Sequence, residues 1–153
     1  MEPIVKSKPA FTIIGLQFRG TNENNACPKL WDKFLPRMAD LQPLLVEPVT
    51  AFGVCSDFDM KVNIFTYTVG LEVKDSNTIP NEMVSMEIPE QEYAIFETTL
   101  PSIMQTFEMI YKNWLPKSEY IRAGGPEFEL YDTDFNPEIA DSKMYIYVPV
   151  LKK

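Results

Sequence analysis

The segment AFGVCSDFD at residues 51–59, followed by NIFTYTVGLEV at 63–73, is echoed later by EFELYDTDF at 127–135 and KMYIYVPVLK at 143–152. Two upstream pairs keep the same order: FTIIGLQFRG (11–20) with EYAIFETTLP (92–101), and FLP (34–36) with WLP (114–116). Each match is weak alone, but four in one order at nearly constant spacing indicate an internal duplication. The sequence therefore predicts one domain over residues 1–153, with repeats at about 3–73 and 82–152.

Each half contains one helical pattern between strand-like stretches. Apolar residues recur at helical spacing in residues 27–38 and again in residues 102–115, where Ser102 is a suitable N-cap and Pro116 a stop. Pro36 is expected to end or kink the first helix. Alternating, β-branched or aromatic stretches predict strands at 10–19, 50–55, 63–73, 84–88, 92–99, 128–132 and 144–150. The acidic stretches at 57–59 and 132–134 are expected to be turns, and the polar residues 74–81 a linker.

This pattern predicts an α+β fold. Two β-α-β-β units would each contribute antiparallel strands and one long helix, and neither unit could bury its sheet and helix alone. We therefore expect antiparallel sheets with two long helices that flank a central groove between the repeats.

Composition excludes several classes of function. The chain has no histidine, which removes Ser-His-Asp and Cys-His catalysis and every histidine-ligated metal site. The net charge of −8 repels phosphate backbones, so direct nucleic-acid binding is not expected. The six glycines form no nucleotide-binding loop of the GxGxxG or GxxxxGK[ST] type. These observations predict neither a metal site nor a cofactor.

The two cysteines, Cys27 and Cys55, are too few for a thiolate zinc site. They are expected to be free, buried thiols of a reducing cytoplasm, with a disulfide between them as the alternative. The N-terminal residues lack the apolar run of a signal peptide, and no stretch approaches the ~20 apolar residues of a membrane span. A cytoplasmic protein without membrane contact is the expectation.

Glu129 is the polar residue that stands out. It lies within a predicted strand, shares a face with Tyr131, and corresponds in the first repeat to Gly53. The duplication would thus set one carboxylate against an empty space across the symmetry axis. The alternative is an exposed residue on an outer face.

Nineteen aromatic residues are many for this length, and several lie in groups on predicted strands. Core packing explains most of them, whereas some could line a cleft between the repeats. The candidates for the cleft are Phe65, Tyr67, Tyr145 and Tyr147, with Trp31 either at a pocket rim or in the core.

Several motifs together resemble the GyrI-like family, also called the AraC-type effector-binding or multidrug-regulator C-terminal domain. They are WDKF at 31–34, YTVGLEV at 67–73, EYAIFE at 92–97, IYKNWLP at 110–116 and the long segment PEFELYDTDFNPEIADSKMYIYVPV at 126–150. The resemblance covers roughly residues 3–152 and is closest to the stand-alone, bacillus-type members.

The resemblance implies a groove that binds lipophilic, cationic small molecules. Glu129 matches the central acid that pairs with the cation, while Tyr67, Tyr147 and Trp31 match aromatic positions around it. A carboxylate among aromatic rings suits an organic cation, and each cation–π contact adds about 0.5–2 kcal/mol when desolvated. The chain shows no helix-turn-helix, so a role related to transcription regulation would depend on a protein partner.

Two other functions stay open. Some GyrI-like proteins hydrolyse electrophilic compounds, and Glu129 with a tyrosine could activate water without histidine. No second acid is clearly aimed at the same point, so a catalytic residue is not assigned. The gyrase inhibitors that name the family suggest a protein-interaction role, with gyrase as a possible partner.

Overall fold

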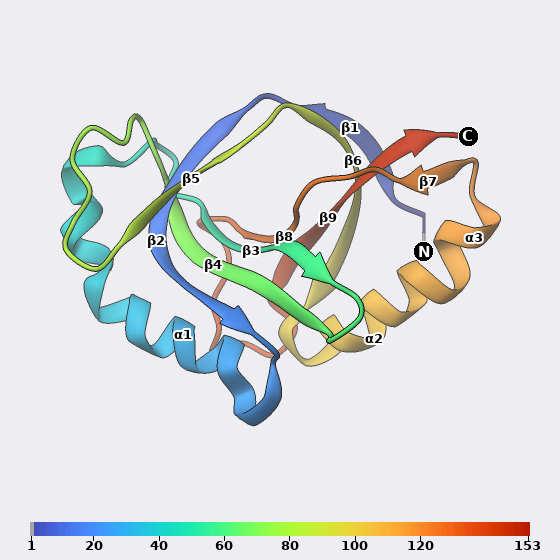
Figure 1. The fold of residues 1–153 in the computed structure, drawn as a ribbon, viewed down its shortest axis with the longest axis horizontal. Helices are drawn as coiled ribbons and strands as arrows, with labels where there is room; N and C mark the ends of the chain where they lie inside the picture. The colour runs from blue at the N-terminus through green and yellow to red at the C-terminus, as the bar shows by residue number, and fades with distance from the viewer. Residues whose placement is uncertain (1) are drawn as a thin grey trace.

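A nine-stranded antiparallel sheet forms the body of the computed structural model, which describes residues 2–153 (Figure 1). Its strands are β1 (Ile4–Lys8), β2 (Phe11–Gly20), β3 (Ala51–Asp59), β4 (Ile64–Val73), β5 (Val84–Ile88), β6 (Gln91–Thr99), β7 (Tyr120–Arg122), β8 (Glu127–Tyr131) and β9 (Lys143–Lys152). Within residues 2–153, no helix combines the length and apolar character that crossing a membrane requires.

The strand order has a mirrored arrangement. It runs β1-β6-β9-β8-β3-β4-β2-β5, with β7 paired to the end of β9. Matched repeat strands, such as β3 with β8 and β4 with β9, lie at equal distances from the centre. The first strand of each half pairs with the other half, β1 with β6 and β5 with β2. The centre of the sheet is therefore the β3–β8 pair, where the two halves meet.

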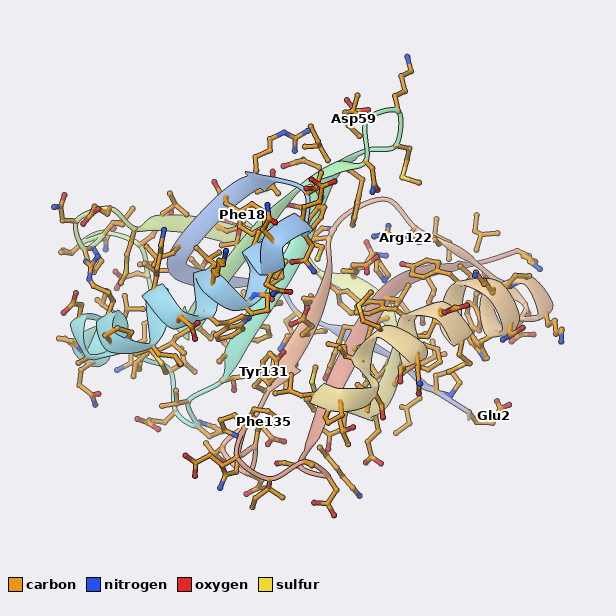
Figure 2. The ribbon with its side chains drawn as sticks, turned by 90° about the horizontal axis from the view of Figure 1, so that it is seen from below. Glu2, Phe18, Asp59, Arg122, Tyr131 and Phe135 are labelled. Carbon is orange, nitrogen blue, oxygen red and sulfur yellow. The ribbon has the colours of Figure 1, made fainter. Side chains whose placement is uncertain are left out.

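Two helical segments cover one face of the sheet, on either side of β3 and β8 (Figure 2). The first comprises a short 3-10 turn η1 (Glu23–Asn25), α1 (Ala26–Phe34) and the 3-10 segment η2 (Leu35–Leu44). The second runs through η3 (Leu100–Ser102), α2 (Ile103–Met109), the π-helical turn η4 (Ile110–Trp114) and α3 (Leu115–Lys117). Pro36 has no N–H to donate, which accounts for the change from α to 3-10 geometry just before it.

Three apolar clusters hold these layers together. Leu30 and Phe34 of α1 pack on β2 and β4, while Ile110 packs on β6 and β9. The third cluster fills the opposite face, where Phe11 of β2 lies 5.6 Å, ring to ring, from Phe128 of β8. Because β3 and β4 separate β2 from β8 in the sheet, this contact shows that the sheet curls around its back face.

The fold class is confirmed, and four local expectations need correction. The strands form one sheet rather than several. β1 and β7 were not expected, because they are short segments without strong alternation. Residues 57–59 form the end of β3 instead of a turn, with a register shift that lets the strand continue. The first helical segment continues as a 3-10 helix to Leu44, well past residue 38 and through both Pro36 and Pro43.

We expect Gly15→Ala to lower the free energy of unfolding by about 3 kcal/mol or more. Gly15 faces Gly70 across the β2–β4 pair, and a methyl group on Gly15 would collide with the backbone carbonyl of Val69. Backbone atoms cannot move aside as a side chain does. Urea unfolding would measure the loss, with Gly124→Ala as the matched control because a methyl group there meets no atom within 4 Å. Equal stability of the two variants would contradict this packing.

Candidate functional site

Glu129 lies on the face of the sheet that the two helical segments cover. Alternation along β8 puts Glu127, Glu129 and Tyr131 on this face, with Phe128 and Leu130 on the other. Trp31 of α1 and Tyr111 of η4 reach the same face from either side, through hydrogen bonds to Tyr67 and Glu127. In Figure 2, Tyr131 lies between the two helical segments.

The Glu129 carboxylate receives two tyrosine hydroxyls on one oxygen. Tyr131 donates to Oε1 at 2.7 Å and Tyr67 donates to the same atom at 3.1 Å. Trp31 Nε1 in turn donates to the Tyr67 hydroxyl at 2.9 Å. Oε2 accepts no hydrogen bond from residues 2–153, and it is not closed off from solvent. One carboxylate oxygen is thus held by the protein, whereas the other has no hydrogen-bond partner among residues 2–153.

Gly53 makes this arrangement possible. It lies directly opposite Glu129 in the β3–β8 pair. A methyl group on Gly53 would collide with the Tyr67 hydroxyl and would come within 2.8 Å of Glu129 Oε1. The space expected across the symmetry axis is therefore present, and the Tyr67 hydroxyl and the Glu129 carboxylate fill it.

Burial raises the pKa of Glu129 to about 7. The two tyrosine hydrogen bonds oppose this shift, and the nearby charge of Glu127 adds to it. Glu129 keeps part of its surface accessible to solvent, although many protein atoms surround its carboxylate. No Lys or Arg among residues 2–153 forms an ion pair with Glu129.

The groups around Glu129 stay neutral near pH 7. Burial, together with the charge of Glu129, raises the pKa of Tyr67 and Tyr131 well above their usual range. The same two causes raise the pKa of the Cys27 thiol to about 12 and also raise that of Cys55. Both cysteines are free, and as protonated thiols they are weak nucleophiles.

A second polar cluster neighbours the first on the same face. Glu127 accepts hydrogen bonds from the Tyr111 hydroxyl and from Arg122 Nη2, the latter at 3.2 Å. The Arg122 guanidinium is thereby engaged with Glu127 and not with Glu129. The described residues also contain no group of three or more acidic or cysteine side chains placed to hold a metal ion.

Aromatic rings form the surroundings of the Glu129 carboxylate. Trp31 and Tyr131 meet edge to face with ring centres 5.2 Å apart, and Phe135 lies 4.9 Å from Tyr131. Trp31 and Phe135 are half-buried and so retain accessible ring surface. Phe65 lies on the face of Tyr67, at a ring distance of 6.5 Å, farther from the carboxylate.

The structure places Tyr145 and Tyr147 away from this cluster. Tyr147 pairs with Phe128 and Tyr145 with Leu130, and paired residues share a face. The Tyr147 ring stacks on Phe128 at 4.7 Å in the back-face core. The expectation that Tyr147 shares the inner surface with Tyr67 is therefore wrong, because it required a register between β8 and β9 that the sheet does not have. A ligand-binding role for Tyr145 and Tyr147 stays a prediction.

Five contributors to the site were not among the predicted binding residues: Tyr111, Arg122, Glu127, Tyr131 and Phe135. Tyr131 and Glu127 stand two positions either side of Glu129, so strand alternation alone could have found them. Arg122 carried no such signal, because it belongs to β7, a three-residue strand that the sequence pattern does not indicate.

We expect Glu129→Gln to stabilise the protein at pH 8 and to have little effect at pH 4. Glu129 has a higher pKa folded than unfolded, so the folded state binds more protons between pH 4.5 and 7. Stability from this group is therefore present below pH 4.5 and lost as the pH rises through about 7. The gain at pH 8 should be on the order of 2–3 kcal/mol in the free energy of unfolding.

Urea unfolding across this pH range would measure the effect, with Glu90→Gln as the control because Glu90 is exposed on a loop. A constant difference between Glu129→Gln and the parent protein at every pH would contradict the raised pKa.

Comparison with known proteins places these features in a family. Residues 1–151 match the GyrI-like small molecule binding domain. The transcriptional regulator BrlR of Pseudomonas aeruginosa is 29% identical over 153 residues, and the match covers 98% of this chain but 56% of BrlR, so the chain spans about half the length of that relative.

Two solved structures share the fold. SAV2435 bound to tetraphenylphosphonium superposes with a TM-score of 0.79 and 19% identity, covering 99% of this chain and 94% of SAV2435. The EcmrR C-terminal domain has a TM-score of 0.75 and 16% identity, covering 99% and 98% of the two chains. With a family match over nearly all its residues, this chain belongs to the GyrI-like small molecule binding domain family.

Proposed function

We propose that this protein binds lipophilic organic cations at Glu129. The observation that carries the proposal is a carboxylate that is crowded by protein atoms and has no cationic partner among residues 2–153. An ionised carboxylate in such surroundings is costly unless a positive charge joins it. A cation that enters with its own apolar surface supplies the charge without a large loss of hydration.

The neighbouring groups suit such a ligand. Oε2 of Glu129 accepts no hydrogen bond from residues 2–153, and the rings of Trp31, Tyr131 and Phe135 surround the carboxylate. Stacking and charge attraction require few directed hydrogen bonds, so ligands of different shape can be accepted. The structure of SAV2435 bound to tetraphenylphosphonium supports this ligand class, because that fold resembles this one.

The proposed role is that of a sensor or sequestering protein related to transcription regulators. BrlR is a transcriptional regulator, and EcmrR has been seen in a complex with DNA. This chain corresponds to 56% and 58% of those two proteins. We infer that this domain acts in the cytoplasm together with a protein partner.

A hydrolase is the second candidate, because two tyrosine hydroxyls already contact the Glu129 carboxylate. Both hydroxyls donate to the same oxygen, and their raised pKa makes them weak proton donors to a substrate. The nearest second acid, Glu127, is engaged by Arg122 and Tyr111. The geometry therefore favours binding over turnover, and steady consumption of an epoxide such as styrene oxide, lost in Glu129→Gln, would reverse that preference.

We expect Glu129→Gln to weaken the binding of tetraphenylphosphonium by at least about tenfold. The change keeps the shape of the side chain and removes its charge. The affinities of the parent protein and of Glu129→Gln for neutral triphenylphosphine oxide should agree within about twofold, because the apolar contacts are the same in both. Isothermal titration calorimetry measures both ligands, with Glu90→Gln as the charge-matched control.

Tyrosine variants then test which aromatic residues belong to the site. Tyr67→Phe should modestly weaken binding of the phosphonium ion. Tyr120→Phe serves as its control, because Tyr120 stacks on Trp114 beside the second helical segment. Tyr147→Phe tests whether the residue on the opposite face of the sheet contributes to binding of the phosphonium ion. If Glu129→Gln bound the cation as tightly as the parent protein, the proposed site would be wrong.

The affinity for tetraphenylphosphonium should rise as the pH increases from 6 to 8. Glu129 is partly protonated in the empty site because its pKa is about 7, and the cation favours the ionised form. Binding near pH 7 should thus release protons, which calorimetry detects when buffers with different ionisation enthalpies are compared. Glu129→Gln should remove both the pH dependence and the proton release, and their persistence in that variant would assign them to another group.

A further inference from the structure

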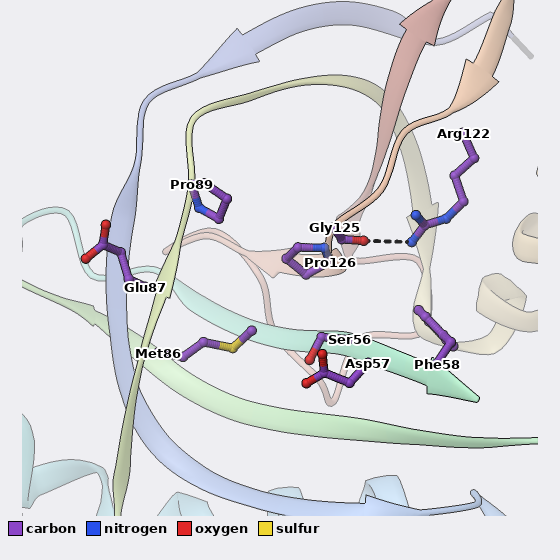
Figure 3. A pocket seen from close by; sticks show the side chains of 9 residues that line it. All are labelled: Ser56, Asp57, Phe58, Met86, Glu87, Pro89, Arg122, Gly125 and Pro126. Atoms are coloured by element: carbon purple, nitrogen blue, oxygen red, sulfur yellow. Dashed lines mark hydrogen bonds between the residues drawn. The ribbon is translucent and has the colours of Figure 1, made fainter.

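Figure 3 shows a pocket whose lining residues do not include Glu129. It has a volume of about 410 Å³ and lies between β3, β5 and the loop that joins β7 to β8. Ser56, Asp57 and Phe58 contribute from β3, while Met86 and Glu87 contribute from β5. Ser56 belongs to the back face, because it alternates with Cys55, which faces the helices.

Ser56 gives this pocket an unmet hydrogen-bonding group. The residue is only 6% exposed, and its hydroxyl is the one fully buried side-chain polar atom without a partner in residues 2–153. A buried hydroxyl without a partner costs about 1–3 kcal/mol. Because Ser56 lines the pocket, rotation about its χ1 angle can turn the hydroxyl toward a bound molecule.

A bulge directs three consecutive residues to the same pocket. In a regular strand, Ser56 and Asp57 would point to opposite faces. The β3–β4 register shifts between Ser56 and Asp59, and Asp57 has a left-handed φ of 52°. Arg19 fixes this irregular backbone by donating to the Asp57 carbonyl at 2.8 Å. The Asp57 carboxylate and the Phe58 ring are thereby brought beside Ser56.

The charges at the pocket favour a cation that carries N–H groups. Asp57 is an exposed carboxylate on one wall, whereas the side chain of Glu87 points away from the pocket, on the other face of β5 from Met86 (Figure 3). The one guanidinium there, Arg122, donates to Tyr111, Ala123, Gly125 and Glu127. It is therefore occupied, and an anionic ligand would meet the Asp57 carboxylate without a free positive partner. Met86, Phe58 and two prolines supply apolar surface.

We propose that this pocket is a second ligand site, which takes a small primary amine with an apolar body. The ammonium would donate to the Ser56 hydroxyl and to the Asp57 carboxylate, with its apolar part against Phe58 and Met86. A quaternary cation has no N–H to donate to these acceptors. The pocket would therefore discriminate between primary and quaternary cations, whereas the Glu129 site would not. This inference does not rest on the function proposed for Glu129.

Titration of the ¹⁵N-labelled protein with 2-phenylethylammonium tests the site by NMR. We expect binding in the high-micromolar to millimolar range, given the small probe and the exposed carboxylate. The shifted amide signals should centre on residues 56–58 and 86–87. The trimethylated quaternary analogue should bind several-fold more weakly, and saturating tetraphenylphosphonium should not displace the amine.

Ser56→Ala is the most informative variant, because it separates a structural role of the hydroxyl, read from the melting temperature, from a binding role, read from the affinity for the amine. Removing a hydroxyl without a partner should leave the melting temperature unchanged or raise it. The affinity for 2-phenylethylammonium should nevertheless fall about fivefold. Asp57→Asn should weaken binding of the amine by about two- to fivefold, with Asp59→Asn as the matched control outside the pocket.

Four results would each overturn the proposal. They are the absence of saturable binding, shifts centred on residues 53 and 127–131, equal affinity of the primary and quaternary amines, and unchanged affinity in Ser56→Ala. None of these results bears on tetraphenylphosphonium binding at Glu129, so the two proposals fail separately.

Discussion

The site depends on one carboxylate held among aromatic rings without a positive partner from residues 2–153. Glu129 lies at the centre of the sheet, and two tyrosine hydroxyls satisfy one of its oxygens. Those hydrogen bonds offset only part of the loss of hydration, since the pKa of Glu129 still rises to about 7. The neutral form is therefore well populated near physiological pH, and any cation that binds competes with a proton.

The mirrored order of the strands explains how an unpaired carboxylate, that of Glu129, can lie at the centre of the sheet. Matched strands of the two halves meet at β3 and β8, so both helical segments face the same central pair. A perfectly symmetric β3–β8 pair would put two identical side chains directly opposite each other, and two carboxylates at such neighbouring positions would repel each other. Gly53 breaks the symmetry, because its lack of a side chain leaves room for Glu129 and for the Tyr67 hydroxyl.

Much of this could be predicted from local pattern. The four echoed segments indicated the order of the elements, and strand alternation joined Glu129 to Tyr131 and set it against Gly53. The face of Tyr147 could not be predicted, because it depends on the register of β9 against β8, which is set by packing of the whole sheet. The bulge at residues 57–59 escaped prediction for a similar reason, since an acidic pair in a strand reads locally as a turn.

The raised pKa of Glu129 links stability to function through the same proton. In the empty protein, ionising Glu129 lowers the free energy of unfolding, because the unfolded chain solvates the charge better. A bound cation reverses this preference by stabilising the ionised form. Uncharged ligands gain binding free energy only from apolar contacts, whereas cations also gain it by pairing with the ionised Glu129 carboxylate. In the proposed function, selectivity for positive charge would therefore arise from an unfavourable feature of the unliganded fold, and a lysine placed near Glu129 would stabilise the protein while removing the reason for a cation to bind.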